Sequence, residues 1–301
     1  MLRNDTDRKQ QDRKKGLRLL SVRFLTSTIS RERMRSGMKR FAFIVSYDGR
    51  GFQGWQQQRS GPTIQGAIED SILQLTGKSV RISGSGRTDT GVSAWGQVFH
   101  CDIEDDRWTE EALRKGMNHF LSPSIRVLLG RHVPPDFHAR HDVVRKIYRY
   151  RLTASSGAGY TPAPLGSPFL THFQYPLDLK RMQETSALFP GIRDYRHFTV
   201  RRSLPEDSRR TVDDIHWEVA PDEIAFWVVG RGFLHMMIRF MVGALIDAGR
   251  GRRTPEEIGA LLASEAPAPK FPLRPVPPEG LSLIRVLYGK RDPFPPFAGE
   301  R

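Results

Sequence analysis

Residues 84–92 read GSGRTDTGV and place one carboxylate, that of Asp89, among glycines and small polar residues. The guanidinium of Arg87 lies two positions earlier. An apolar run ending at Ile82 predicts a strand before this stretch, and the alternation over residues 97–103 predicts another after it. Glycines at such a corner permit backbone conformations that are closed to other residues and let a bulky ligand approach the main chain. The alternative interpretation is an ordinary polar turn in which Asp89 bonds its own backbone.

The glycine spacing of this stretch does not make a nucleotide-binding loop. Gly86 and Gly91 have the spacing of a P-loop, but Val92 stands where the phosphate-binding lysine is required. A dinucleotide fingerprint starting at Gly84 would need its third glycine at the position of Asp89. A nucleotide-dependent enzyme is therefore disfavoured.

Composition and charge indicate a polyanionic partner. The chain of 301 residues is long enough for one or two domains, and it carries a formal net charge of +14. No apolar run approaches the roughly 18 residues that a membrane span needs. The single cysteine, Cys101, excludes an internal disulfide framework and fits a reducing cytosol, so we expect a cytoplasmic protein. The histidines are not joined by cysteines or acidic residues at metal-ligand spacing, so we expect no metal.

The N-terminal segment is a basic extension. Residues 1–37 carry 11 Lys and Arg against 4 Asp and Glu, which is half of the net charge of the chain. Arg-rich segments with Ser and Thr resemble mitochondrial transit peptides, but such peptides are poor in acidic residues. The acidic residues of this segment are Asp5, Asp7, Asp12 and Glu32. Organellar targeting is therefore disfavoured, and we expect a disordered or untranslated extension.

The hydrophobic pattern predicts a first structural unit after this extension. Residues 41–47 predict a strand, and the apolar residues of 64–75 predict a helix that Gly77 ends. A second helix is predicted from Thr109, followed by a strand over residues 125–129. This order of strand, helix, strands, helix and strand is typical of a ferredoxin-like unit.

A similar order recurs in the second half of the chain. The predicted elements are a strand over 146–153, a helix near 179–188, strands near 214–219 and 224–229, a helix over 233–248 and a strand over 281–288. A capping box at 254–257 predicts one more helix. We therefore expect an α+β fold of two pseudo-repeated ferredoxin-like halves with a shared mixed or antiparallel sheet. The halves are residues 38–145 and 146–290, and residues 291–301 are a tail.

The predicted strand at 146–153 carries two aromatic residues beside basic ones. Because side chains alternate along a strand, Lys146, Tyr148 and Tyr150 share one face, while Arg149 and Arg151 share the other. An aromatic ring beside a basic strip suits stacking on an unpaired base, worth about 1–3 kcal/mol. The alternative is a strand with its rings in the core, which we favour for Tyr150.

The predicted helix at 233–248 is apolar on nearly every side, so it should be largely buried. Arg239 lies inside it, four residues after His235 on the same predicted face. An isolated buried guanidinium is too costly to tolerate, so Arg239 needs an anionic partner. From these residues alone, any carboxylate could serve as that partner.

Several blocks in a fixed order together resemble one family. The block at 86–100 has the form GRTDxGVxAxGQVxH. The others are YDG with FxGWQxQ at 47–58, TxQ at 63–65, DFHAR at 136–140, KxYxY at 146–150, GFLHxMxRxxxG at 232–243 and PxGL at 278–281. They resemble the tRNA pseudouridine synthase A family. Trp95, Arg231 and Met236 depart from the residues usual there, and Met236 stands where a second histidine is common.

The resemblance implies an isomerase that converts uridine to pseudouridine at positions 38 to 40 of the tRNA anticodon stem-loop. It implies that Asp89 is the nucleophile, that Arg239 is its counter-ion and that Tyr148 contacts the target uracil. Arg87 would contact backbone phosphates and help to hold the target nucleotide out of the stack. Leu281 would form an apolar wall of the uracil pocket.

By the same resemblance, Thr88 and Lys146 belong to the substrate-binding set, in a central basic cleft. The reaction oxidises nothing and imports no group, so no cofactor is expected. The family suggests a homodimer whose two subunits share one tRNA. The alternative function is a non-catalytic basic RNA-binding protein on the same scaffold. Such a binder would have no use for Asp89, Arg239 and Tyr148 together.

Overall fold

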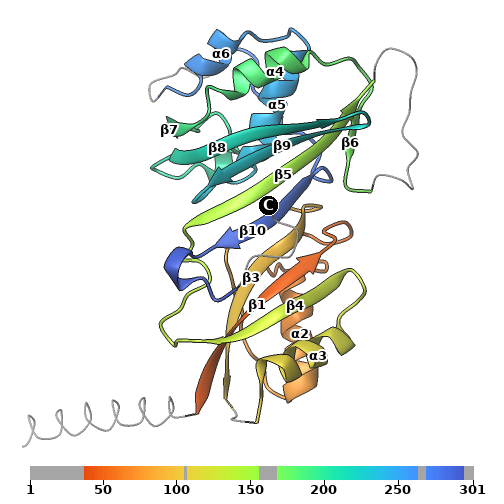
Figure 1. The fold of residues 1–301 in the computed structure, drawn as a ribbon, viewed down its shortest axis with the longest axis vertical. Helices are drawn as coiled ribbons and strands as arrows, with labels where there is room; N and C mark the ends of the chain where they lie inside the picture. The colour runs from red at the N-terminus through yellow and green to blue at the C-terminus, as the bar shows by residue number, and fades with distance from the viewer. Residues whose placement is uncertain (1–36, 105–106, 156–167, 264–268, 295–301) are drawn as a thin grey trace, which may run out of the picture.

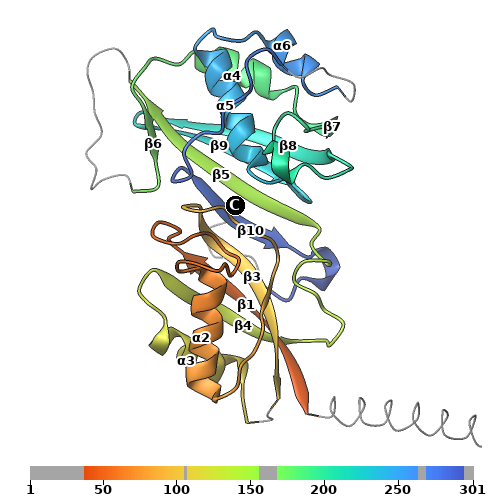
Figure 2. The ribbon, with the colours of Figure 1, turned by 180° about the vertical axis from the view of Figure 1, so that it is seen from behind.

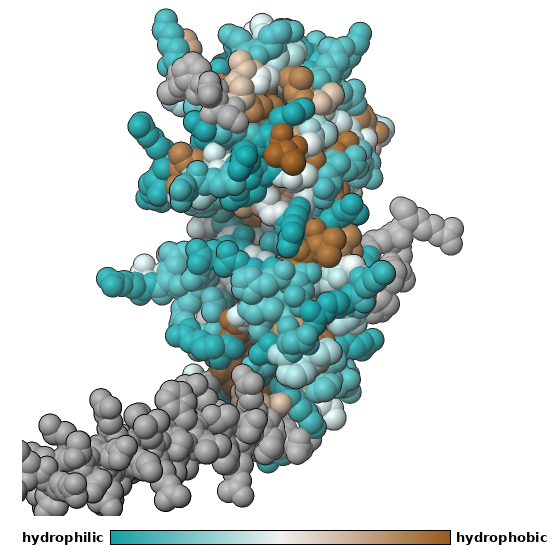
Figure 3. Space-filling model, turned by 90° about the vertical axis from the view of Figure 1, so that its left-hand side faces the viewer, coloured by the Kyte–Doolittle hydropathy of each residue, from teal (hydrophilic) through white to brown (hydrophobic). Residues whose placement is uncertain are grey.

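The structure is a computed structural model that describes residues 37–104, 107–155, 168–263 and 269–294. The predicted extension therefore lies outside the described residues, apart from Gly37, and so does most of the predicted tail. One hydrophobic core runs through the described part of the chain. Figure 3 shows hydrophilic residues over most of the face that it presents, with separate hydrophobic patches. Within the described ranges, no helix is long and apolar enough to cross a membrane.

The first half has the strand order of a ferredoxin-like unit. Its elements are β1 (Met38–Tyr47), α2 (Ile64–Thr76), β2 (Ser83–Gly84), β3 (Ser93–Glu104), α3 (Glu110–Phe120) and β4 (Ile125–Val133). The sheet runs β4-β1-β3, and β2 pairs with β3. The strand predicted from the apolar run at Ile82 is wrong in extent, because only Ser83 and Gly84 pair.

The ends of α2 follow local chemistry that the sequence already displays. The Thr63 hydroxyl accepts a hydrogen bond from the backbone N–H of Gly66 and so satisfies one free donor of the first turn. Gly77 ends the helix with a left-handed φ of 71°, and its N–H donates to the Leu73 carbonyl. The predicted end of this helix at Gly77 is confirmed.

The second half repeats this order. Its elements are β5 (Arg145–Ala154), β6 (Thr171–Phe173), α4 (Leu179–Ser186), β7 (Gly191–Asp194), β8 (Arg209–Ala220), β9 (Glu223–Gly230), α5 (Met237–Gly249), α6 (Pro255–Ala260) and β10 (Leu281–Leu287), with 3-10 turns η1 (Arg201–Ser203) and η2 (Gly289–Arg291). The sheet runs β10-β5-β9-β8-β7. The capping box predicted at the start of α6 is confirmed. The short strands β6 and β7 were not predicted.

The two halves share one sheet through β3 and β10. These strands pair in parallel at only two positions, Ser282 with Ser93 and Leu283 with Ala94. Because β2 covers only the part of β3 near Phe99, the beginning of β3 is open to β10. Figure 1 shows β10 between β3 and β5, and Figure 2 shows α2 and α5 on the same face of the sheet. The predicted fold of two similar halves with a shared mixed sheet is confirmed.

Helix α5 begins later than predicted, at Met237 instead of residue 233. Met236 precedes it with a left-handed φ of 61°, which is costly for a side chain with a Cβ. Phe233 and Leu234 still pack on the core, so the apolar pattern continues through a segment that is not helical. As a result, His235 lies in the turn before α5 and does not share a helix face with Arg239.

Candidate active site

The loop at 84–92 is fastened to the start of β3. The Ser85 backbone N–H donates to the Val98 carbonyl at 2.7 Å. The Ser85 hydroxyl donates to the side-chain oxygen of Gln97, and the Gln97 amide nitrogen donates to the Gly86 carbonyl at 3.1 Å. Gln97 is fully buried, so these bonds are shielded from water and fix the first part of the loop.

Two predicted substrate-binding residues also hold this loop. The Thr88 hydroxyl lies 2.8 Å from the Tyr47 hydroxyl, and the Thr88 carbonyl accepts the N–H of Trp55. The Nζ of Lys146 donates to the Ser85 carbonyl at 2.9 Å. Burial, together with the charge of Arg140, lowers the pKa of Lys146 to about 8. In this structure both side chains act on the loop itself.

The position of Gly91 in the loop leaves no room for a side chain. Its φ is +78°, and a Cβ there would lie 2.8 Å from Cγ of Pro278. The segment just before β10 therefore packs directly against the loop that carries Asp89.

The Asp89 carboxylate faces two side chains of the second half. Its Oδ2 lies 3.5 Å from Nη1 of Arg239, and its Oδ1 lies 3.5 Å from Nε2 of His235. The Asp89 side chain is 19% exposed, and that of Arg239 is 12% exposed. The predicted pairing of Asp89 with Arg239 is confirmed. The contact with His235 was not predicted, although His235 belongs to the sequence block that contains Arg239.

Arg239 is held in place by a second partner. Its Nε donates to the Val276 carbonyl at 2.8 Å, and its own carbonyl accepts the Val276 N–H at 3.1 Å. The guanidinium therefore gives one nitrogen to Asp89 and another to the backbone before β10. This arrangement holds the positive charge next to the carboxylate.

Tyr148 and Tyr150 lie on neighbouring alternate positions of β5 but have different surroundings. Tyr148 is buried and meets Phe233 edge to face, with ring centroids 5.4 Å apart. Burial, followed by Tyr47 and Asp89, raises the pKa of Tyr148, so its phenol stays protonated at neutral pH. The Tyr150 hydroxyl donates to the Pro277 carbonyl at 3.0 Å and lies 2.8 Å from the Thr171 hydroxyl, and its burial confirms the expected place of Tyr150 in the core.

The other predicted site residues lie at the surface or in the sheet. Arg87 is exposed and makes no hydrogen bond or ion pair with any described residue. Leu281 is buried at the start of β10, opposite Tyr150 in the strand ladder.

A cavity of about 630 Å³ lies at the other end of α5, beside Asp247 and Arg250, and does not include Asp89. Among the described residues, no three His, Cys, Asp or Glu side chains group as a metal site.

The site thus brings the partly buried carboxylate of Asp89 together with the guanidinium of Arg239. Comparison with known proteins identifies the family of the chain. The family model for tRNA pseudouridine synthase matches residues 43–142 and 186–289. It therefore covers the loop of Asp89 as well as α5 and β10.

Relatives in several bacteria match over most of their length. A tRNA pseudouridine synthase A of Listeria monocytogenes is 40% identical over 83% of this chain and 100% of its own. Proteins of the same name from Halalkalibacterium halodurans and Methylobacterium radiotolerans are 37% and 34% identical, over 76% and 83% of this chain and 86% and 98% of their own. The chain belongs to the tRNA pseudouridine synthase A family.

Proposed function

We propose that this enzyme forms pseudouridine at positions 38 to 40 of the tRNA anticodon stem-loop and that Asp89 is its nucleophile. Membership of the family makes the protein an isomerase that forms pseudouridine in tRNA. The observation that supports Asp89 as the nucleophile is the position of its carboxylate, which faces Arg239 and does not bond its own backbone. An ordinary polar turn would not direct a carboxylate at a largely buried guanidinium.

The reaction needs one positioned carboxylate. The N1–C1′ bond of uridine breaks, the uracil turns, and a C5–C1′ bond forms. N1 gains a proton and C5 loses one, so the reaction is redox-neutral. Asp89 would either attack C1′ or remove a ribose proton to give a glycal. In both routes the positive charge of Arg239 faces the carboxylate and helps to orient it.

The target base has to leave its stack before it can react. Flipping a base costs a few kcal/mol, which stacking on Tyr148 and phosphate contacts from Arg87 would offset. Arg87 is free for such a contact, because it has no partner among the described residues. Leu281 would close the uracil pocket within a basic cleft between the halves. Thr88 and Lys146 would serve the substrate by holding the loop.

We also propose that the enzyme works as a homodimer in the cytoplasm. The resemblance of the whole chain to its family supports two subunits that share one tRNA. The single buried thiol, that of Cys101, is compatible with a reducing compartment. A sedimentation measurement of the purified protein, with and without tRNA, would test the dimer.

Asp89→Asn tests the nucleophile, because asparagine keeps the size of the side chain and loses the ionised oxygen. Pseudouridine formation should disappear, while tRNA affinity should stay within about threefold, since phosphate contacts dominate affinity. The readout is site-resolved pseudouridine mapping on tRNA from cells that lack the wild-type protein and express the variant. Turnover above a few per cent of wild type in the purified variant would refute Asp89 as the nucleophile. Normal mapping in cells without the protein would refute the assigned positions.

A further inference from the structure

The second contact of Asp89, with His235, belongs to a connected set of side chains. His235 precedes α5 and presents Nε2 to Oδ1 of Asp89 at 3.5 Å. Its Nδ1, on the opposite edge of the ring, lies 3.0 Å from the hydroxyl of Ser203 in η1. The ring therefore bridges the 3-10 turn η1 and the carboxylate of the loop at 84–92.

The backbone of His235 is tied to the same turn. The Thr199 hydroxyl donates to the His235 carbonyl at 2.8 Å, and Thr199 is buried. Ser203 donates its N–H to the Val200 carbonyl, which closes η1. His235 is thus held at its carbonyl and at its ring by one segment, residues 199–203.

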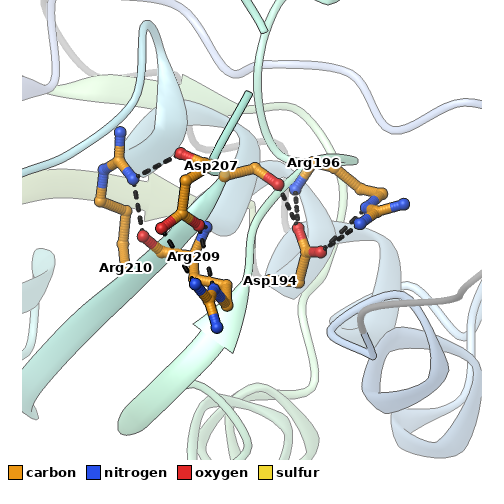
Figure 4. Close-up of polar contacts among 6 residues, drawn as sticks. Asp194, Arg196, Asp207, Arg209 and Arg210 are labelled. Carbon is orange, nitrogen blue, oxygen red and sulfur yellow. Dashed lines mark hydrogen bonds and ion pairs between the residues drawn. The ribbon is translucent and has the colours of Figure 1, made fainter. Parts of the chain in front are cut away.

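That segment is part of a braced loop, as Figure 4 shows at its base. The buried carboxylate of Asp194 accepts hydrogen bonds from the backbone and guanidinium of Arg196 and from the Ser208 hydroxyl at 2.6 Å. Burial alone would raise the pKa of Asp194, but the hydrogen bonds from Arg196 and Ser208 outweigh it and hold that pKa below its ordinary value. An ionised, buried carboxylate therefore joins both ends of the loop that carries Ser203.

One tautomer of the neutral imidazole serves both neighbours of the ring, Ser203 and Asp89. When the Ser203 hydroxyl donates to Nδ1, the ring proton of neutral His235 lies on Nε2. The protonated Nε2 then lies 3.5 Å from Oδ1 of Asp89, and Nη1 of Arg239 lies 3.5 Å from Oδ2. A carboxylate with a donor to only one of its oxygens can rotate about its Cβ–Cγ bond. A donor to each oxygen fixes the plane of the carboxylate.

We propose that His235 is a positioning residue for Asp89: Ser203 fixes its tautomer, and its Nε2–H sets the plane of the nucleophilic carboxylate. The proposal rests on the proposed role of Asp89 as the nucleophile. The separation of 3.5 Å is long for a hydrogen bond, and catalytic contacts of this kind commonly shorten when substrate binds. His235 acts only through Asp89 and donates nothing to the uridine.

Two conservative variants separate this role from a merely structural one. In His235→Gln, the side-chain amide nitrogen occupies the place of Nε2 and can still donate to Asp89, but the contact with Ser203 is lost. In His235→Asn, the amide reaches only as far as Nδ1, so the contact with Ser203 survives and the donor to Asp89 is lost. Both variants are uncharged and keep Arg239 in place.

The measurement is the single-turnover rate of pseudouridine formation with saturating enzyme over a tRNA substrate, alongside the affinity for that tRNA. His235→Gln should stay within about threefold of wild type, and His235→Asn should lose about tenfold or more, both with tRNA affinity unchanged. The reverse order would assign His235 to anchoring η1 and overturn the proposal. Equal rates in both variants and wild type would overturn it as well.

Ser203→Ala tests the tautomer step. In the wild-type background it should slow the reaction severalfold, because Nδ1 then competes for the ring proton. In the His235→Gln background it should have no further effect, because glutamine offers no atom at the place of Nδ1. Equal slowing in both backgrounds would show that Ser203 does not act through the ring.

His216 provides a matched control outside the site. Its Nδ1 lies 3.7 Å from Asp214 on the exposed strand β8, and the ring stacks on Trp227. His216→Gln and His216→Asn should both leave the rate unchanged. Asp89→Asn separates the proposed role of Asp89 from the proposed role of His235. Activity in that variant would overturn the nucleophile itself, whereas an inactive Asp89→Asn with equal His235 variants would overturn only the role of His235.

Discussion

Arg239 and Asp89 form an ion pair in which Nη1 lies 3.5 Å from Oδ2. The Nε of the same guanidinium donates to the Val276 carbonyl at 2.8 Å. Asp89 lies before β3 in the first half, and Arg239 lies in α5 of the second half. The ion pair therefore joins the two halves and is anchored at a third point, the backbone that leads into β10.

Arg239→Leu should impair catalysis more than folding. Leucine suits the apolar helix, while Asp89 loses its counter-charge, and turnover should fall about 10²–10³-fold. Arg239→Lys should recover only part of the activity, because an ammonium group cannot serve Asp89 and the Val276 carbonyl together. Turnover and urea unfolding of both variants provide the check. An equal loss of stability and activity in Arg239→Leu would contradict the assignment.

Tyr148→Phe should bind tRNA like wild type, because the ring that stacks is retained. It should react more slowly if the hydroxyl assists removal of the C5 proton in the second half of the reaction. Tyr148→Ala should lose affinity for the flipped base as well, by about 1–3 kcal/mol. Because the pKa of Tyr148 is raised, the rate should show no tyrosine ionisation below pH 10. A phenylalanine variant as fast as wild type would show that the ring alone matters.

Gly91→Ala should disturb the loop of Asp89, and Gly51→Ala is its matched control. Both glycines have a left-handed φ, of +78° and +84°. A Cβ at Gly91 would meet Pro278 at 2.8 Å, whereas a Cβ at Gly51 would meet nothing within 4 Å. Both variants should lose about 1 kcal/mol of unfolding free energy from backbone strain. Only Gly91→Ala should also lose turnover. Equal turnover in the two would mean that the contact with Pro278 does not shape the site.

His100 should make the protein less stable in mild acid. Its Nδ1 accepts the Ala139 N–H at 3.1 Å, and burial, with Arg40, lowers its pKa from 6.5 to about 4. The unfolded chain therefore binds more protons between pH 6.5 and pH 4. The stability due to neutral His100 is complete above pH 6.5 and is lost as the pH falls towards 4.

His100→Asn isolates this effect, because its side-chain oxygen can accept the same N–H and does not titrate. Urea unfolding of wild type and variant between pH 7.5 and pH 4 should give curves that converge as the pH falls. A constant difference over the whole range would mean that the pKa of His100 is not lowered by folding.

The sequence predicted the architecture well where local chemistry is decisive. Glycine in the left-handed region ends α2 at the expected residue, and alternation along β5 separates the face of Tyr148 from that of Arg149. Because a buried arginine needs an anion, the sequence predicted a partner for Arg239. The family resemblance selected Asp89 from the available carboxylates.

The remaining features depend on tertiary contacts that no local pattern encodes. Helix α5 begins after Met236 because the backbone there turns left-handed, which an unbroken apolar run conceals. His235 faces Asp89 from that turn. The helical spacing of His235 and Arg239 therefore predicted a shared helix face that does not exist, although both residues belong to the same sequence block. Strand β2 is only two residues long, and the N–H of Ile82 just before it donates to the Glu69 side chain instead of to β3.

The shared edge of β3 and β10 has a mechanical consequence. Only two residue pairs join the strands, at Ser93 and Ala94, a few positions after Asp89. The seam is narrow, so contacts beside it, including that of Lys146 with Ser85, also join the two halves. Asp89 and Arg239 belong to different halves, so the distance between them depends on the angle between the halves. The distance between the Asp89 carboxylate and its counter-charge therefore reports the relative orientation of the two halves.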